Sequence, residues 1–169
     1  MSNPRPLGFD AIAEARRQWE AHGWAAPAAM AATTSIMRAQ QIILARTDEA
    51  LRAFDLTFAR YEALVLLAFS RQGALPLGKM GDRLMLHPTS VTNIVDRLER
   101  QGLVQRTRHP TDRRTTLAEI TDDGRRVVDK ATEAVSATGF GMAALGDDDL
   151  DHITALLRTM RVDAGDFPG

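Results

Sequence analysis

Apolar residues recur at helical spacing over most of the chain and alternate with polar residues in one short region only. The first pattern indicates helices, and the second indicates two strands joined by a tight turn. The chain therefore predicts a mainly α protein with one β-hairpin. The expected helices cover residues 9–23, 27–54, 57–73, 75–84, 88–102, 121–138 and 147–162, and the expected strands cover residues 103–109 and 114–120.

The segment 27–54 predicts a long helix with a proline in its first turn. Its apolar residues are too many for one narrow stripe, so such a helix has more than one buried side. We expect it to be shared between a core and a partner subunit. These apolar residues are Met30, Ile36, Met37, Ile43, Leu44, Leu51 and Phe54.

The composition of the chain excludes several classes of protein. The 169 residues are 44% hydrophobic and 25% charged, which suits a single globular domain, residues 1–169. There is no cysteine, which excludes disulfides, thiolate metal sites and a thiol-based redox sensor within this chain. No apolar run approaches the roughly 20 residues that cross a bilayer, and the first residues lack a signal-peptide core. We therefore expect a cytoplasmic protein without a membrane partner.

Residues 76–120 follow the order of a winged helix-turn-helix: a short helix, a turn, a second helix and a two-stranded ribbon. In the second helix, Val91, Val95 and Leu98 share one face. The opposite face begins with small hydrogen-bonding residues, which can approach base edges in a major groove. The exposed residues of this helix are Thr89, Asn93, Asp96 and Arg100, with Ser90 and Arg97 beside them.

Positive charge gathers between residues 97 and 114, although the formal net charge of the whole chain is -1. Six arginines stand against Glu99 and Asp112, so six minus two gives a net charge of +4 in these 18 residues. Arginine suits bidentate phosphate contacts and narrow minor grooves. A solvated hairpin would explain a lone basic ribbon, but the helix-turn-helix pattern directly upstream favours DNA binding.

The stretch SVTNIVDRLERQGLVQRTRHPTDRRTTLAEITDDG, residues 90–124, resembles the MarR (multiple antibiotic resistance regulator) family of transcription factors. In that family the recognition helix ends in Asp-Arg-Leu-Glu, and Gly-Leu-Val and an arginine follow. The wing then carries Asp-x-Arg, and Leu-Thr-x-x-Gly opens the next helix. Here Ile120 replaces the commoner leucine and Ala118 a commoner valine, which leaves the chemistry unchanged. The helix order across residues 27–165 also matches, so the resemblance covers nearly the whole chain.

The resemblance implies a homodimeric repressor, or less often an activator, on a pseudo-palindromic operator in double-stranded DNA. Helices within residues 9–54 and 121–165 would form the dimer, and residues 57–120 would form the winged helix-turn-helix lobe. The recognition helix would enter the major groove and the wing the neighbouring minor groove. The implied DNA-binding residues are Thr89, Ser90, Thr92, Asn93, Arg97, Arg100, Arg106, Arg108, His109, Arg113 and Arg114.

The resemblance also assigns separate roles within the wing. The family's wing aspartate pairs with the arginine two residues later and orients the tip. Carried over, Asp112 positions the wing by holding Arg114, and Arg113 is left as the residue that probes the groove. Arg106 and Arg108 then flank phosphates.

A small-molecule effector is a further implication, because many such regulators are released from DNA by a ligand between the dimer region and the DNA-binding lobe. One subgroup, which responds to urate or related anions, has an added N-terminal helix with a tryptophan, and Trp19 resembles that position. The subgroup's acid in the third helix matches Glu62, but its two arginines are replaced by Phe69 and Ile94. Trp19 and Glu62 are thus ligand-binding candidates, with packing of the added helix as the simpler interpretation of Trp19.

Other function classes are less favoured. An enzyme would need a Gly-rich phosphate loop, a nucleophile elbow or a carboxylate pair beside a base, and none occurs in the sequence. The four histidines form no cluster at ligand spacing, so no metal or other cofactor is expected. A winged helix that binds protein instead of DNA is the alternative, and steep salt dependence of DNA binding would distinguish the two. The sequence leaves open the operator, the target genes, repression versus activation, and the effector.

Overall fold

The computed structural model describes residues 7–109, 111–112 and 114–168, and the chain divides into two compact units. The first unit extends to Ala45, and the second begins at Arg46. The long helix α2 (Pro27–Leu51) runs from the first unit into the second. It ends three residues earlier than predicted, and a 3-10 helix, η1 (Arg52–Phe54), continues it.

The first unit contains α1 (Ala11–Ala21) and the N-terminal part of α2. The Asp10 carboxylate caps α1 by accepting the backbone N–H groups of Ile12 and Ala13 at 2.9 and 3.2 Å. Gly23 follows the helix with φ at +67°, in the left-handed region, which confirms it as the predicted helix stop. α1 buries none of its residues within the described chain.

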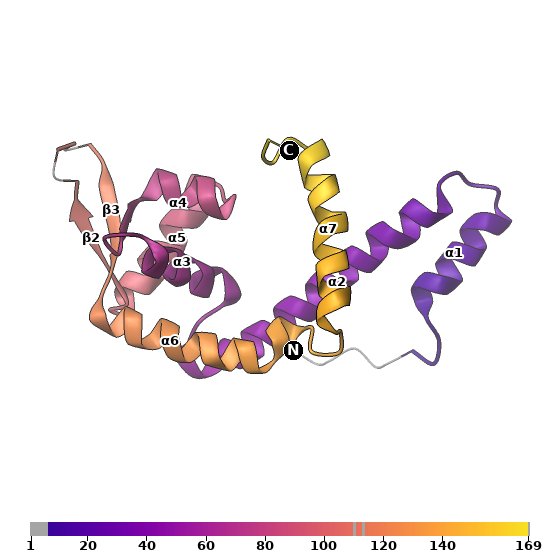
Figure 1. The fold of residues 1–169 in the computed structure, drawn as a ribbon, viewed down its shortest axis with the longest axis horizontal. Helices are drawn as coiled ribbons and strands as arrows, with labels where there is room; N and C mark the ends of the chain where they lie inside the picture. Colours follow the sequence, from indigo (N-terminus) through magenta and orange to yellow (C-terminus); the bar gives the residue numbers. More distant parts are fainter. Residues whose placement is uncertain (1–6, 110, 113, 169) are drawn as a thin grey trace. The chain divides into compact units, whose positions relative to one another are not determined.

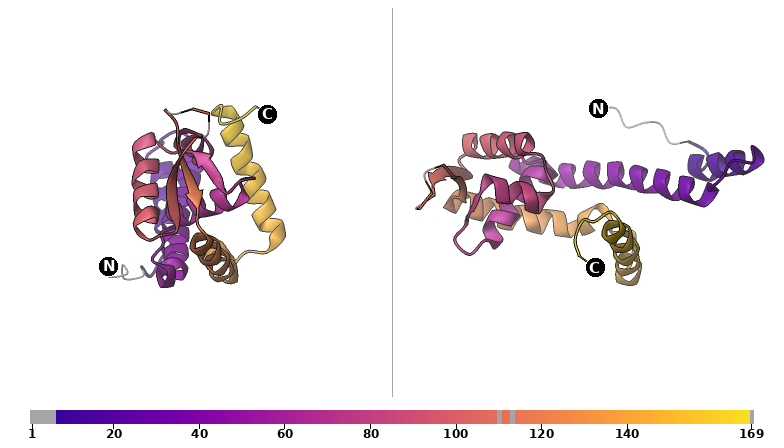
Figure 2. Two further views of the ribbon diagram at one scale, coloured as in Figure 1. Left: turned by 90° about the vertical axis from the view of Figure 1, so that its left-hand side faces the viewer. Right: turned by 90° about the horizontal axis from the view of Figure 1, so that it is seen from above.

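The second unit contains a winged helix-turn-helix, which confirms the predicted fold class (Figure 1). The strands of the wing lie at one end of this lobe in Figure 1 and in the right view of Figure 2. After η1 the elements are α3 (Phe58–Phe69), β1 (Ala74–Pro76), α4 (Leu77–Leu84), α5 (Pro88–Arg100), β2 (Val104–Arg108), β3 (Thr116–Ile120), α6 (Asp122–Ala137), η2 (Gly139–Gly141) and α7 (Asp147–Asp163).

The sheet has three antiparallel strands in the order β1-β3-β2, one more than the predicted hairpin. The additional strand, β1, places Leu75 opposite Ala118 of β3. The prediction that a helix begins at Leu75 is therefore wrong, since α4 begins at Leu77. The physical reason lies in the two residues before it: Leu75 is buried within the sheet, and Pro76 holds extended backbone just before the first helical turn.

One apolar core fills the space between α3, α4, α5, α6 and the sheet. Leu64 and Leu67 of α3 pack there at helical spacing, as do Val91, Val95 and Leu98 of α5. All five side chains are essentially inaccessible to solvent. Because the core holds this face of α5, the opposite face is presented to solvent.

The start of α6 is tied to the sheet by Thr121 and Gly124. The Thr121 hydroxyl donates to the Gly102 carbonyl at 2.8 Å and accepts the Gly124 N–H at 3.0 Å, which confirms Thr121 as the predicted N-cap. A Cβ at position 124 would overlap the backbone carbonyl oxygen of Leu103. Glycine therefore allows the close approach of α6 to the segment that leads into β2.

The last helix, α7, buries none of its residues within the described chain. Leu156 and Met160 are 74% and 56% exposed. Three aspartates occupy its first turn, where negative charge is favourable beside the unpaired N–H groups of the helix start. In the part of the chain that the structure describes, no helix has both the length and the apolar character needed to pass through a membrane.

Candidate nucleic-acid interface

The recognition helix α5 begins at a well-defined cap. His87 precedes the helix, and its Nδ1 accepts the backbone N–H of Thr89 at 3.3 Å. Pro88 occupies the first helical position, where the missing N–H removes no intrahelical hydrogen bond. The first turn is thereby fixed with Thr89 and Ser90 exposed.

The exposed face of α5 carries hydrogen-bonding groups that the protein itself leaves largely unused. Among the described residues, no hydrogen bond satisfies the side chains of Thr89, Ser90 or Asn93. The Thr92 hydroxyl donates to the Pro88 carbonyl at 3.0 Å, which leaves its oxygen able to accept a further hydrogen bond. Structure and sequence therefore agree on which side of α5 can meet a ligand.

Four of the predicted DNA-binding arginines are exposed: Arg97, Arg100, Arg108 and Arg114. Within the described chain none of them forms an ion pair with a carboxylate. Arg100 uses its Nε to donate to the Asp96 carbonyl at 3.1 Å, and its terminal nitrogens remain available. These residues thus present positive charge that the protein does not neutralise locally.

Two cationic residues that the sequence patterns did not single out join this surface. Arg60 of α3 lines a depression of about 520 Å³ together with Arg97 and Arg100. Lys79 of α4 lines another, of about 670 Å³, with Arg114 of the wing turn. Arg60 and Lys79 lie on helices that precede α5 in the sequence. Only the packing of these helices around the core brings the two side chains close to the exposed arginines.

Arg106 has a different environment from the other arginines of this region. Its guanidinium forms ion pairs with Glu99 and Asp96 of α5, at 2.5 Å to the Asp96 oxygen, and its backbone N–H donates to Glu99 at 3.1 Å. Burial would lower the pKa of Arg106, but these hydrogen bonds outweigh it and raise that pKa above its usual value. Two carboxylates thus contact this guanidinium and join β2 to α5, and the contact of Arg106 with a phosphate stays a prediction.

The wing turn is closed by His109 and Asp112. The Nδ1 of His109 accepts the backbone N–H groups of Thr111 and Asp112 at 3.4 and 3.2 Å. Asp112 accepts the Arg114 backbone N–H at 3.0 Å and the Thr115 hydroxyl at 2.7 Å, and these hydrogen bonds, that of Thr115 first, lower the pKa of its carboxyl. Asp112 therefore holds Arg114 through its backbone and not, as expected, through its guanidinium. The predicted groove residue, Arg113, lies outside the described residues.

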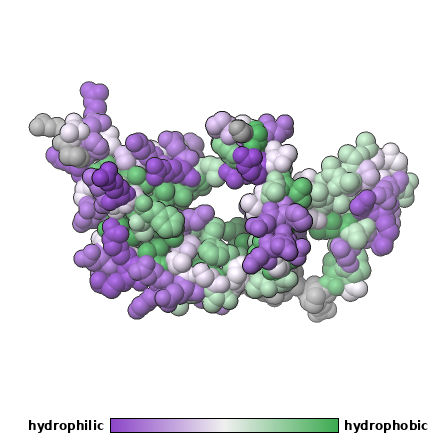
Figure 3. All heavy atoms as spheres, viewed as in Figure 1, coloured by the Kyte–Doolittle hydropathy of each residue, from purple (hydrophilic) through white to green (hydrophobic). Residues whose placement is uncertain are grey.

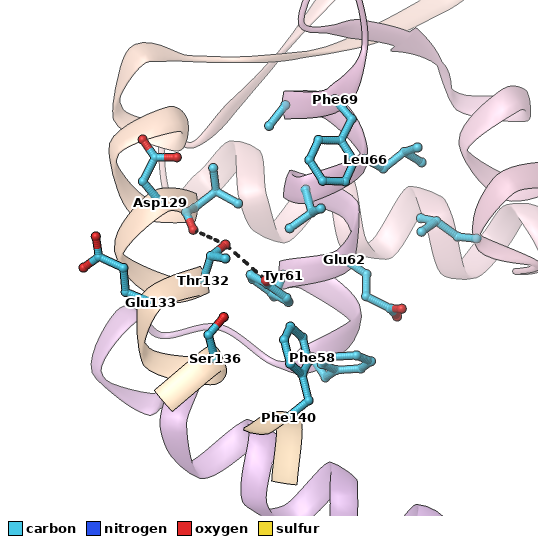
Figure 4. A pocket seen from close by; sticks show the side chains of 14 residues that line it. Phe58, Tyr61, Glu62, Leu66, Phe69, Asp129, Thr132, Glu133, Ser136 and Phe140 are labelled. Carbon is cyan, nitrogen blue, oxygen red and sulfur yellow. Dashed lines mark hydrogen bonds between the residues drawn. The ribbon is translucent and has the colours of Figure 1, made fainter. Parts of the chain in front are cut away.

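A pocket of about 970 Å³ lies between α3, α6 and the end of α4 (Figure 4). Its lining is largely apolar and includes Phe58, Tyr61 and Phe69 of α3. The space-filling view shows hydrophobic residues on the side of this lobe that faces the viewer in Figure 1 (Figure 3). Leu84, the last residue of α4, lines it too, so the pocket touches the helix just before the turn into α5. Glu62 also lines it, and desolvation raises the pKa of its carboxyl.

Comparison with known proteins places this geometry in a family. The model of the MarR family matches residues 56–116, which include α3 to α5 and β2. The chain is also 32% identical over 106 residues to the organic hydroperoxide resistance transcriptional regulator of Bacillus subtilis strain 168, and the match covers 63% of this chain and 70% of that protein. The chain belongs to the MarR family of transcriptional regulators.

Solved structures of MarR-family proteins share the fold. Sco5413, a MarR family transcriptional regulator from Streptomyces coelicolor, is 55% identical with a TM-score of 0.77, and the match covers 83% of this chain and 98% of Sco5413. CouR from Rhodococcus jostii RHA1, solved bound to p-coumaroyl-CoA, is 28% identical with a TM-score of 0.66 over 79% of this chain and 90% of CouR. The family relatives are transcriptional regulators rather than enzymes.

In this MarR-family chain the two ligand candidates lie in different units, Trp19 in the first and Glu62 in the second. The Trp19 Nε1–H donates to the Ala25 carbonyl at 2.9 Å, and its ring meets that of Trp24 edge-to-face with centroids 4.9 Å apart. These contacts close the turn between α1 and α2, which favours the packing interpretation of Trp19. Of the two residues that replace the subgroup's arginines, Phe69 lines the pocket and Ile94 packs against the core.

Proposed function

We propose that this MarR-family regulator is a homodimeric repressor that binds a pseudo-palindromic operator. α5 enters the major groove, and the wing formed by β2 and β3 reaches the adjacent minor groove. The observation that carries this proposal is the joint exposure of unused hydrogen-bonding side chains on α5 and of four arginines without carboxylate partners within the described chain.

The interface residues divide by role. The short side chains at the start of α5 read base edges, while the cationic side chains around them contact phosphates and fix the register on the duplex. Asp112 and His109 position the wing turn by their hydrogen bonds to its backbone. The base-reading residues are Thr89, Ser90, Thr92 and Asn93, the phosphate contacts are Arg60, Lys79, Arg97, Arg100, Arg108 and Arg114, and Arg113 keeps its predicted place in the minor groove.

Dimerisation through the terminal helices is supported by the apolar surface that they leave exposed. On α2, Ile36 and Met37 are 42% and 57% exposed, and α7 exposes Leu156 and Met160. Soluble monomers rarely leave extended apolar faces in water, because burying them is favourable at about 25 cal/mol per Å². A second copy of the chain covers these faces in the proposed dimer, within residues 9–54 and 121–165.

A small molecule in the pocket between α3, α4 and α6 releases the operator in this proposal. The pocket reaches Leu84 at the end of α4, and the next residue, Met85, makes the turn toward α5 with φ at +55°. An occupant that displaces Leu84 therefore changes the backbone that sets the direction of α5. CouR, whose structure holds p-coumaroyl-CoA, supports a ligand-responsive family member.

The salt dependence of operator binding tests this function. DNA fragments are selected from a random pool, and the affinity for the best one is measured between about 50 and 200 mM NaCl. The plot of log affinity against log salt has a negative slope. Arg97→Ala and Arg108→Ala should each make this slope shallower by about 0.9, because each variant loses one contact that neutralises a phosphate.

Arg16→Ala is the matched control, since Arg16 lies on α1 and pairs with Glu20 at 3.0 Å. Its slope should equal that of the unmodified protein. If all three variants gave the slope of the unmodified protein, Arg97 and Arg108 would not contact phosphates. A slope near zero for the unmodified protein would instead favour the alternative, a winged helix that binds protein.

A further inference from the structure

The pocket between α3, α4 and α6 is lined by carboxylates on two opposite elements. Glu62 belongs to α3, whereas Asp129 and Glu133 belong to α6 (Figure 4). None of the lining residues is an arginine, lysine or histidine, and within the described chain none of the three carboxylates forms an ion pair. All three side chains are exposed, and in Figure 4 the carboxylates of Asp129 and Glu133 point away from α3, so the rim of the pocket and not its interior carries negative charge without a compensating cation.

The hydroxyl groups of the pocket also favour a ligand that donates hydrogen bonds. The Thr132 hydroxyl donates to the Val128 carbonyl at 2.7 Å, which uses its only hydrogen. The Tyr61 hydroxyl lies 3.1 Å from the Thr132 oxygen and must therefore be the donor in that pair. Both oxygens keep lone pairs and offer no further hydrogen, so they can only accept from a ligand.

Aromatic rings in the pocket also favour a cationic ligand. Phe58, Tyr61 and Phe69 from α3 and Phe140 from η2 line the same pocket. The face of an aromatic ring attracts a cation, and the attraction grows when the cation is desolvated. A volume of about 970 Å³ is large enough for a ligand of several rings.

We propose that this pocket binds an apolar aromatic cation, and that such a cation is the effector that releases the regulator from DNA. This inference rests on the proposed function, which makes the pocket the effector site. A preference for cations would distinguish this chain from the subgroup that responds to urate or related anions, because Phe69 and Ile94 replace the two arginines of that subgroup. The desolvation that raises the pKa of Glu62 agrees with a carboxylate that lacks a cation.

Tetraphenylphosphonium and tetraphenylborate test the sign of the charge directly, since they share their shape and differ in charge. Each is titrated into the full-length protein by calorimetry in sodium chloride. Tetraphenylphosphonium should bind at one site per chain and about tenfold or more tighter than tetraphenylborate. Glu62→Gln and Glu133→Gln should each weaken its binding by about twofold to fivefold, the range of a partly exposed ion pair.

Asp82→Asn is the matched control, because Asp82 is an exposed acid of α4 that does not line the pocket. It should leave the affinity for tetraphenylphosphonium unchanged. The proposed cation site would be wrong if tetraphenylborate bound as tightly as tetraphenylphosphonium. It would also be wrong if neither Glu62→Gln nor Glu133→Gln changed the affinity for tetraphenylphosphonium. Absence of phosphonium binding would overturn it as well.

The same ligand is then added to the preformed complex with the selected operator fragment. Release of DNA supports both the cation site and the effector role. Specific phosphonium binding that leaves the DNA complex intact supports the cation site and contradicts the effector role. A tight-binding tetraphenylborate that releases DNA supports the effector pocket and contradicts its preference for cations.

Discussion

At the scale of single residues, the arginines of the interface differ by the carboxylates beside them. Arg97 and Arg108 face solvent without an ion-pair partner in the described chain, whereas Arg106 is neutralised by Asp96 and Glu99. The sequence predicted all of them as DNA contacts, because charge counting treats each arginine alike. The pairing of Arg106 depends on how closely β2 packs against α5, which spacing along the chain does not reveal.

Glu62 carries a residue-scale prediction about stability and pH. Its pKa is raised in the folded state by desolvation, so the ionised carboxylate destabilises the fold. This penalty is absent below the usual glutamate pKa and develops as pH rises through the raised value. Glu62→Gln should therefore raise the Tm slightly at pH 7, by at most about 2 °C at this degree of exposure, and leave it unchanged near pH 4.

Thermal unfolding at equal chain concentration measures this difference. A gain in Tm that persists at pH 4 would show that the glutamine acts through packing and not through charge. A loss of Tm at pH 7 would contradict the desolvated environment of Glu62. The same experiment shows that the Glu62→Gln variant is folded before its ligand affinity is compared.

At the scale of elements, the sequence predicted every long helix and both wing strands, because each has a clear period and a capping signal. Thr121 and Gly23 are examples of such signals that the structure confirms. β1 was missed because three residues are too few to show alternation, and Leu75 fits a helix pattern equally well. Its pairing with β3 is a tertiary contact. The pocket was predicted only through Glu62, since its other walls meet only after α3 packs against α6.

Gly124 carries the element-scale prediction. An alanine in a helix normally stabilises it relative to glycine by about 0.5–1 kcal/mol. Here the added Cβ would overlap the Leu103 carbonyl oxygen, and a backbone group cannot move aside without shifting α6 or the start of β2. Gly124→Ala should therefore lower the free energy of unfolding by about 1–3 kcal/mol, since the overlap outweighs the helix preference.

Gly78→Ala is the control for Gly124→Ala, because Gly78 lies in α4 and its added Cβ has no atom within 4 Å apart from its chain neighbours and the backbone of its own helix. It should be neutral or stabilising by up to about 1 kcal/mol in urea unfolding. If both variants lost stability equally, the contact between α6 and Leu103 would not be the cause. If Gly124→Ala were stabilising, the close approach at this junction would be wrong.

At the scale of the whole molecule, the near-neutral net charge and the basic interface are compatible because charge is distributed unevenly. The formal net charge of the chain is -1, although residues 97–114 alone carry +4 (six arginines minus two acids). α7 begins with three aspartates, and it exposes Leu156 and Met160. One region thus suits a polyanion, while the terminal helices offer the apolar surface that the proposed dimer requires.

In the proposed function two copies of the chain bind one pseudo-palindromic operator, and the stoichiometry of the DNA complex is the decisive test. Light scattering is applied to the protein alone and to its complex with a selected fragment that carries two half-sites. In that fragment the half-site centres lie about one DNA turn apart, roughly 34–36 Å. We expect two chains in the free protein, two chains per fragment, and a large loss of affinity when one half-site is scrambled. One chain per fragment, with equal affinity for intact and half-scrambled DNA, would contradict this proposal.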